Sequence, residues 1–205
     1  MNEIALLIAA SLSAGTPLAL AGLGLLINEK VGVVNLGAEG MMLIAAVVGF
    51  ATAFHTGSPL LAFAAGAVAG ALSAALFGVL AIWLNTNQYA TGLAVSLFGG
   101  GFSAFVGVQY VGKTLTRAGS NSILVLGDIP FIGPALFQQH PMVYATVLIA
   151  LGMAWFFSRT HMGLVLRSVG ENPESAHALG YPVRLLRLAA VMAGGALCGA
   201  YTTLR

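Results

Sequence analysis

Long apolar stretches alternate with short polar segments along the whole chain. Each stretch comes close to the roughly 20 residues that an α-helix needs to cross a bilayer. Asn, Gly, Pro and charged residues gather between the stretches, where helices end and turns form. The pattern predicts an all-α, polytopic transmembrane helical bundle with about six spans, at residues 4–27, 38–54, 60–84, 89–111, 142–158 and 186–204.

The composition fits a membrane protein and excludes several other classes. Hydrophobic residues make up 59% of the chain and charged residues only 7%, against about 25% charged in soluble domains. Residues 40–112 contain no Asp, Glu, Lys or Arg, so they offer no charged outer face to a soluble domain. A net charge of +2 is too small to indicate nucleic-acid binding. One cysteine with four scattered histidines indicates no metal site.

The first apolar stretch is predicted to be a retained span. The three residues before it lack the basic region of a signal peptide, and residues 4–27 are too long for a signal peptide's apolar core. We expect one transmembrane domain over residues 1–205.

The basic residues predict the orientation of the bundle. If the six spans alternate in direction, five basic residues fall on one side of the membrane and two on the other. The five are Lys30, Arg159, Arg167, Arg184 and Arg187, and the two are Lys113 and Arg117. Because Lys and Arg are in excess on the cytoplasmic side, we expect the loop of residues 159–187 in the cytoplasm and the N-terminus outside.

A short polar helix is predicted inside that cytoplasmic loop. Asn172 is a good N-cap residue, Pro173 suits the first helical position, and Glu174 complements the helix dipole. Gly180 can end the helix in the left-handed conformation. The rod of residues 173–179 measures roughly 10 Å and is too short to be stable alone. We interpret it as a docking element for a partner.

A second polar segment links the first two spans and contains Asn35, Gly37 and Glu39. Glu39 falls in the first turn of the second span, where a carboxylate complements exposed amides. If the segment enters the bilayer, these polar groups lie at depth, where such groups are costly and often functional. Two interpretations stay open: a cap with an interface anchor, or the lining of a substrate path.

Small residues repeat every four positions in two spans. They are Gly66, Gly70, Ala74 and Gly78 in the third span, and Gly195 and Gly199 in the sixth. Such stripes let helix backbones approach closely in lipid. We therefore predict helix–helix packing, with a path-lining role as the less favoured alternative.

Residues 107–114 match the phosphate-loop pattern G-x-x-x-x-G-K-T. That site needs a strand before the loop and a helix after it, whereas a membrane span precedes this segment. The chain also has a single aspartate, Asp128, in a Pro- and Gly-rich segment. We therefore predict no nucleotide site. We also predict no catalytic site, because the paired carboxylates Glu171 and Glu174 lie on the polar helix, where solvation is the simpler explanation for them.

Two motifs carry a family resemblance. Glu174-Ser175-Ala176, followed by Gly180, resembles the E-A-A-x-x-x-G cytoplasmic loop of ABC-importer permeases, with Ser175 in place of the middle alanine. The segment of residues 33–40 resembles the N-x-G-x-E-G segment of permeases for nucleosides and simple sugars.

Two further segments, residues 129–134 and 167–173, are also similar to that group. The group includes relatives of branched-chain amino acid and ribose permeases, and the resemblance covers nearly the whole chain.

The resemblance implies the permease subunit of an ATP-driven importer in the cell inner membrane. Its partners would be a second permease subunit, two ABC ATPase subunits that bind the ATP, and an extracellular substrate-binding protein. The chain itself would need no cofactor. Nucleosides or simple sugars are the expected cargo, and branched-chain amino acids rank lower. Family members generally have about eight or more spans, so we interpret the end at Arg205 as a C-terminal truncation.

The resemblance also assigns roles to residues. Contact with the ATPase falls to the docking helix and its flanks: Glu171, Asn172, Pro173, Glu174, Ser175, Ala176 and Gly180. The main alternative is an ion-coupled secondary transporter, which usually carries ionisable residues inside its spans. A third interpretation is a membrane scaffold that transports nothing.

Overall fold

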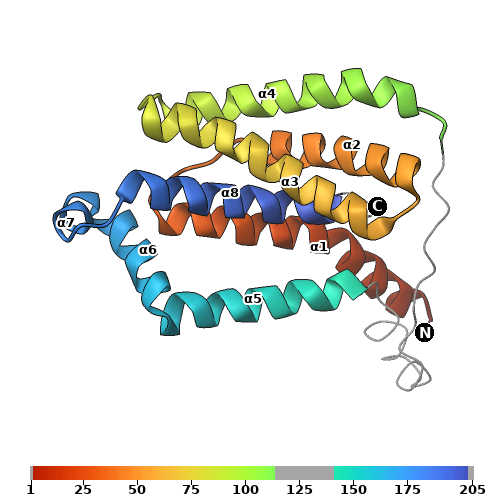
Figure 1. The fold of residues 1–205 in the computed structure, drawn as a ribbon. Helices are drawn as coiled ribbons and strands as arrows, with labels where there is room; N and C mark the ends of the chain where they lie inside the picture. The colour runs from red at the N-terminus through yellow and green to blue at the C-terminus, as the bar shows by residue number, and fades with distance from the viewer. Residues whose placement is uncertain (1, 114–140, 203–205) are drawn as a thin grey trace.

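The computed structural model describes residues 2–113 and 141–202. All regular structure within those residues is helical, as predicted. The elements in chain order are α1 (Asn2–Lys30), α2 (Ala38–Thr56), α3 (Pro59–Gly78), the π-helical turn η1 (Val79–Trp83), α4 (Gln88–Gly107), the 3₁₀ turn η2 (Val108–Tyr110), α5 (Pro141–Arg159), α6 (His161–Glu171), α7 (Pro173–Ala178) and α8 (Val183–Thr202) (Figure 1).

Six helices in the described part of the chain are long and apolar enough to cross a membrane, which confirms the predicted multi-pass bundle. They cover Leu7–Lys30, Ala38–Thr56, Pro59–Trp83, Gln88–Tyr110, Met142–Arg159 and Val183–Ala200. The last span begins three residues before the predicted residue 186. The reason is that Arg184 lies in the first helical turn, where a long side chain keeps its charged end in the polar zone.

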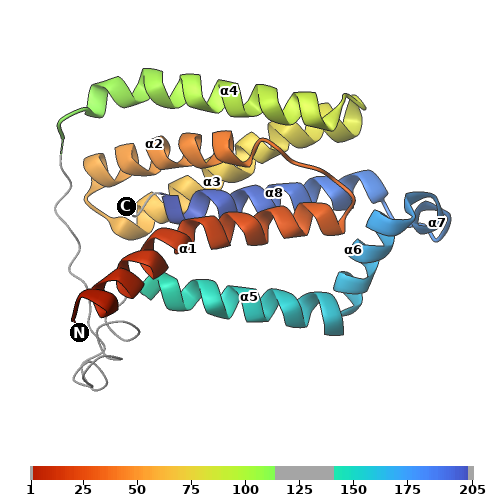
Figure 2. The ribbon, with the colours of Figure 1, turned by 180° about the vertical axis from the view of Figure 1, so that it is seen from behind.

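The bundle is built around α8. This helix packs most extensively against α3 and α1, and it also contacts α2. Helix α2 packs against α3 and α4, while α5 contacts α1 and α6. Figures 1 and 2 show α4 and α5 at opposite edges of the bundle. The largest buried cluster lies between the α1–α2 loop, α3 and α8, and it includes Val33, Met41, Phe77 and Val191.

The predicted small-residue stripes of α3 and α8 face each other. A Cβ atom on Gly195 would collide with the Gly70 carbonyl, and one on Gly70 would collide with the Gly195 carbonyl. A Cβ on Gly199 would meet the carbonyl oxygen of Gly66. The two backbones are therefore in direct contact, which is how helices gain packing energy in lipid without a hydrophobic driving force between them.

The remaining glycine of the stripe and a second crossing extend this pattern. Gly78 lies where an added Cβ would come 2.6 Å from the Leu188 side chain of α8. On the other side of α8, Gly194 packs against Gly24 of α1, each facing the other's carbonyl oxygen. Helix α8 is thus held between α1 and α3 by backbone contacts at adjacent residues.

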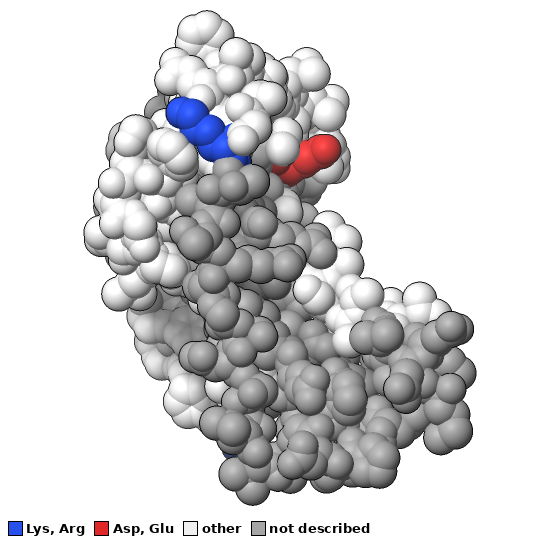
Figure 3. All heavy atoms as spheres, turned by 90° about the vertical axis from the view of Figure 1, so that its right-hand side faces the viewer, with Lys and Arg blue, Asp and Glu red and all other residues white. Residues whose placement is uncertain are grey.

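Charge is distributed unevenly between the two ends of the bundle. The five basic residues predicted on one side lie at the α7 end, in α6 or at the ends of α1, α5 and α8. The opposite end, turned to the viewer in Figure 3, shows few charged atoms on its described surface. Arg117 lies outside the described residues.

Candidate coupling surface and substrate path

Helix α7 begins where the sequence predicted. The Asn172 side-chain oxygen accepts a hydrogen bond of 3.0 Å from the Ser175 backbone N–H, and Pro173 occupies the first helical turn. Glu174 lies in that turn as well, where its charge complements the exposed amides. The helix covers Pro173–Ala178, with Leu179 at its C-cap.

Its C-terminal end is closed by two further hydrogen bonds. Gly180 has φ +87°, and its N–H donates to the His177 carbonyl at 2.9 Å. The Tyr181 N–H donates to the Ala176 carbonyl at 3.2 Å. This pair of bonds is the Schellman motif, which favours glycine at the left-handed position.

One side chain of α7 anchors the helix, and most of the others are exposed. Ala176 is 1% exposed and packs with Val165 and Val169 of α6. Glu171, Asn172, Glu174, Ser175, His177 and Ala178 are exposed. Leu179 is 77% exposed, although it is apolar. A capped helix that presents polar side chains and one bare leucine is suited to contact another protein.

The sequence did not predict α6, which holds α7 in place. The Thr160 side-chain oxygen caps it by accepting from the Gly163 N–H at 3.0 Å. Near its C-terminus, Gly170 packs against the Lys30 carbonyl at the end of α1. Helix α6 is amphipathic and runs across the end of the bundle rather than through it (Figure 1). Its apolar residues are too few for a span, which is why the hydrophobic pattern alone missed it.

The α1–α2 loop meets α6 at Gly32. This glycine has φ +73°, and a Cβ there would lie 3.0 Å from the Gly170 carbonyl oxygen. Arg187 Nη2 reinforces the junction by donating to the Val169 carbonyl at 3.2 Å. The end of α6, the loop and the start of α8 therefore form one contact zone.

From this junction the loop descends into the bundle beside α4. The Val34 N–H donates to Gln88 Oε1 at 2.8 Å, and Ser96 Oγ donates to the Leu36 carbonyl at 3.0 Å. Gln88 and Ser96 are eight residues apart on α4, or about 12 Å along its axis. Helix α2 accordingly begins inside the bundle rather than level with the ends of α1 and α8 (Figure 2).

The three predicted path residues lie at the bottom of this loop in different environments. Asn35 is buried, and its Oδ1 accepts from the Gly37 N–H at 2.9 Å while Nδ2 lies 3.6 Å from Met41 Sδ. Gly37 is buried, and an added Cβ would lie 3.2 Å from the Val95 side chain, which is a tight contact. Glu39 is exposed in the first turn of α2. Asn35 and Gly37 shape the loop, and Glu39 offers a carboxylate.

One buried polar residue was not identified from the sequence. Asn28 is 1% exposed, and neither its side-chain oxygen nor its nitrogen has a hydrogen-bond partner in the described part of the chain. Its carbonyl accepts from the Val31 and Val33 amides and so starts the loop. An unpaired buried polar group costs about 1–3 kcal/mol. A single polar residue near the end of an apolar run was the only available signal.

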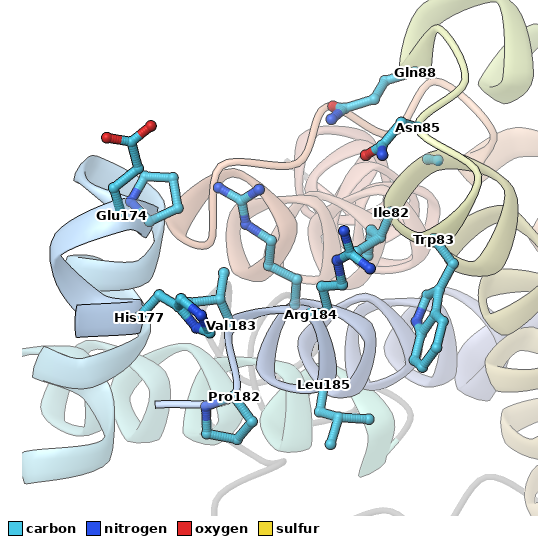
Figure 4. A pocket seen from close by; sticks show the side chains of 13 residues that line it. Ile82, Trp83, Asn85, Gln88, Glu174, His177, Pro182, Val183, Arg184 and Leu185 are labelled. Atoms are coloured by element: carbon cyan, nitrogen blue, oxygen red, sulfur yellow. The ribbon is translucent and has the colours of Figure 1, made fainter. Parts of the chain in front are cut away.

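A cavity of about 590 Å³ opens beside α7 (Figure 4). Its walls come from α7, the first turns of α8, the turn η1 and the segment that leads into α4. The π-helical hydrogen bond from Leu84 N–H to the Val79 carbonyl, 3.1 Å long, widens the end of α3 at this point. No sequence pattern predicted the π-turn, because it lies in an uninterrupted apolar run.

The segment that matches the phosphate-loop pattern has a different geometry. It runs from the last residue of α4 through η2, so a helix and not a strand precedes Gly112. Lys113 Nζ lies 4.6 Å from the centre of the Phe54 ring and 5.1 Å from that of Tyr110. Thr114 lies outside the described residues, as do Asp128 and the motif at residues 129–134.

The described residues contain no group of three or more His, Cys, Asp or Glu that could hold a metal ion.

Comparison with known proteins identifies the family. The model of the branched-chain amino acid transport system permease component matches residues 7–202. A Haloferax volcanii protein provisionally named glucose ABC transporter permease TsgC13 is 38% identical, over 98% of this chain and 62% of that protein. The Bacillus subtilis guanosine ABC transporter permease NupQ is 32% identical, over 96% of this chain and 65% of its own length.

A third relative, the nucleoside ABC transporter permease NupC of Lactococcus lactis, is 32% identical, over 97% of this chain and 66% of its own. The chain thus spans 62–66% of the length of these relatives, which is less than two thirds. No solved structure gave a significant match. The six apolar helices and the family match over nearly all of the chain agree with each other. The members of this family are transport proteins and not enzymes. The chain is a multi-pass membrane protein and belongs to the family of permease components of the branched-chain amino acid transport system.

Proposed function

We propose that this chain forms the translocation path of an ATP-driven importer and that α7 couples it to a separate ATPase. The observation that carries the proposal is the form of α7. Asn172 and Gly180 fix both ends of the helix, Ala176 anchors it, and nearly all other side chains are exposed. A rigid, exposed helix can pass on a partner's movement to the helices that hold it.

The contacts of α7 suggest how such a movement reaches the path. Helix α7 packs on α6, the end of α6 packs on Gly32, and the loop after Gly32 ends at Glu39. We propose that ATP binding by the partner shifts these connected contacts between two packed arrangements. One arrangement opens the path to one side of the membrane, and the other opens it to the opposite side. Glu39, an exposed carboxylate in the first turn of α2, is the proposed path residue.

We assign the remaining coupling residues to the contact with the ATPase. Glu171 and Glu174 are exposed carboxylates that would pair with basic side chains of that partner. Pro173 and Ser175 complete the N-terminal cap. The ATP would be bound by the partner, so this chain would need no cofactor.

The proposed orientation places the α7 end in the cytoplasm. The five basic residues at that end support it, because cytoplasmic loops carry the excess of Lys and Arg. The N-terminus would then lie outside the cell inner membrane. The proposed assembly adds a second permease subunit, two ATPase subunits and an extracellular substrate-binding protein.

The proposed cargo is a nucleoside or a simple sugar. The names of the relatives support this class, since they refer to glucose, guanosine and nucleosides. Branched-chain amino acids are the second candidate, because the family description refers to them.

The test is to purify the full-length protein with its partners and to reconstitute the complex in liposomes. The ligand that the binding protein retains is identified by mass spectrometry, and its uptake is measured with and without internal ATP. We expect an ATPase in the complex and uptake that requires ATP. Uptake that continues without ATP and stops with an uncoupler would instead indicate an ion-coupled transporter. Uptake of leucine or valine, but of no nucleoside or sugar, would overturn the cargo assignment.

A further inference from the structure

We propose that the cavity beside α7 binds the headgroup of an anionic phospholipid. The cavity contains an excess of positive charge. Arg184 and Arg187 line it, together with His177, against the single carboxylate Glu174. Figure 4 shows the Glu174 carboxylate pointing away from the Arg184 side chain. Among the described residues neither arginine has an acidic partner, and Arg187 Nε is buried without any hydrogen-bond partner.

The position of the two arginines adds to this imbalance. Both lie within the first two turns of α8, three residues apart and so on one face of the helix. The first turn of α8 contains no acidic residue. The N-terminus of a helix carries partial positive charge, which favours anions and disfavours cations. A phosphate beside the two guanidinium groups would relieve the repulsion between them.

The rim of the cavity indicates a lipid rather than a soluble phosphate. Trp83 is 48% exposed and lines the cavity, and tryptophan is enriched where a membrane meets water. Leu185, which lines the cavity from α8, is 56% exposed. These apolar groups beside two arginines match the two parts of a phospholipid, and basic pockets between spans at the cytoplasmic side are known headgroup sites.

A track for the acyl chain continues from this rim. Leu72, Leu76, Val79 and Trp83 are all more than 40% exposed and are spaced as one face of a helix. Leu72 and Leu76 also line an apolar groove of about 500 Å³ between α2, α3 and α4. From Trp83 to Leu72 the track covers 11 residues, or about 16 Å. This is close to one leaflet of a hydrocarbon core about 30 Å thick.

The experiment uses the fluorescence of Trp83 in the full chain reconstituted in lipid nanodiscs. The chain has two tryptophans, so Trp155→Phe leaves Trp83 as the only one. Phosphatidylglycerol with brominated acyl chains is titrated into the discs, and brominated phosphatidylcholine is the comparison. We expect phosphatidylglycerol to quench Trp83 at a lower mole fraction. Each arginine should contribute about fivefold to this preference, as expected for a basic residue near an anionic surface.

Three variants and a competitor test the assignment. Arg184→Gln with Arg187→Gln should abolish the preference, while Arg159→Gln with Arg167→Gln, at the same end but outside the cavity, should keep it. Glu174→Gln removes the single carboxylate that lines the cavity and should strengthen it. Equal quenching by the two lipids, the same loss in both double variants, or no gain in Glu174→Gln would overturn the proposal. Displacement by millimolar inorganic phosphate would also overturn it and assign the cavity to a soluble anion.

Discussion

Replacement of Gly180 by valine should uncouple α7 without unfolding the protein. Gly180 has φ +87°, and an added Cβ would meet nothing within 4 Å. The substitution therefore introduces backbone strain without a collision. A left-handed residue with a Cβ costs about 1–2 kcal/mol, which corresponds to a shift of roughly 5- to 30-fold between two states. A helix of six residues has no stability of its own to oppose that shift.

The expected result is a loss of coupled uptake of about fivefold or more, in proportion to the shift in α7. The amount of protein in the membrane and its unfolding temperature should stay unchanged, because α7 lies at the surface. Uptake and ATP hydrolysis are measured together in liposomes that contain the full complex. Hydrolysis that continues while uptake falls would indicate uncoupling.

Gly57 provides a matched control at the other end of the bundle. It has φ +66°, and an added Cβ there also meets nothing within 4 Å. Gly57→Val therefore carries similar strain but should leave coupling intact. Gly180→Asn should restore uptake, since asparagine tolerates the left-handed conformation. Normal uptake in Gly180→Val, or an equal loss in Gly57→Val, would refute the reasoning.

Three further substitutions test other parts of the structure. Gly70→Val should reduce the yield of folded protein, because overpacking against the Gly195 carbonyl costs about 1–3 kcal/mol. Gly22→Val should leave the yield unchanged, since a Cβ there meets nothing within 4 Å. Size-exclusion profiles of the two variants would show the difference. Asn28→Leu should raise the unfolding temperature, because it removes two unpaired polar atoms worth about 1–3 kcal/mol each, and a lower unfolding temperature would show that the amide stabilises the fold. Asn172→Ala should weaken coupling through loss of about 1 kcal/mol of capping, while Asn172→Ser should preserve uptake; equal uptake in both variants would show that the cap does not matter.

The sequence predicted those parts of the structure that depend on local chemistry. The spans follow from uninterrupted apolar runs. Helix α7 follows from Asn172, Pro173 and Gly180, each of which acts on the backbone within a few residues.

Several features that depend on distant neighbours were not predicted. Helix α6 is too short and too amphipathic to register as a span, and it is held by contacts with α1 and α8. The burial of Asn28 depends on Gly194, whose missing side chain leaves space for the amide. The cavity beside α7 exists because η1, α7 and α8 meet there, although they are far apart in the chain. Hydrophobic periodicity contains none of this information.

The glycine crossings of α8 have a mechanical consequence. Gly194 touches the backbone of α1 and Gly195 touches that of α3, so the helix is held on both sides at one level, where only the Asn28 and Ala74 side chains also approach it. This level is the point about which α8 would tilt. It lies about 17 Å from Val183, next to α7, and about 11 Å from Thr202 at the far end. A tilt of α8 about this point would therefore move its α7 end roughly 1.5 times as far as its other end, and in the opposite direction.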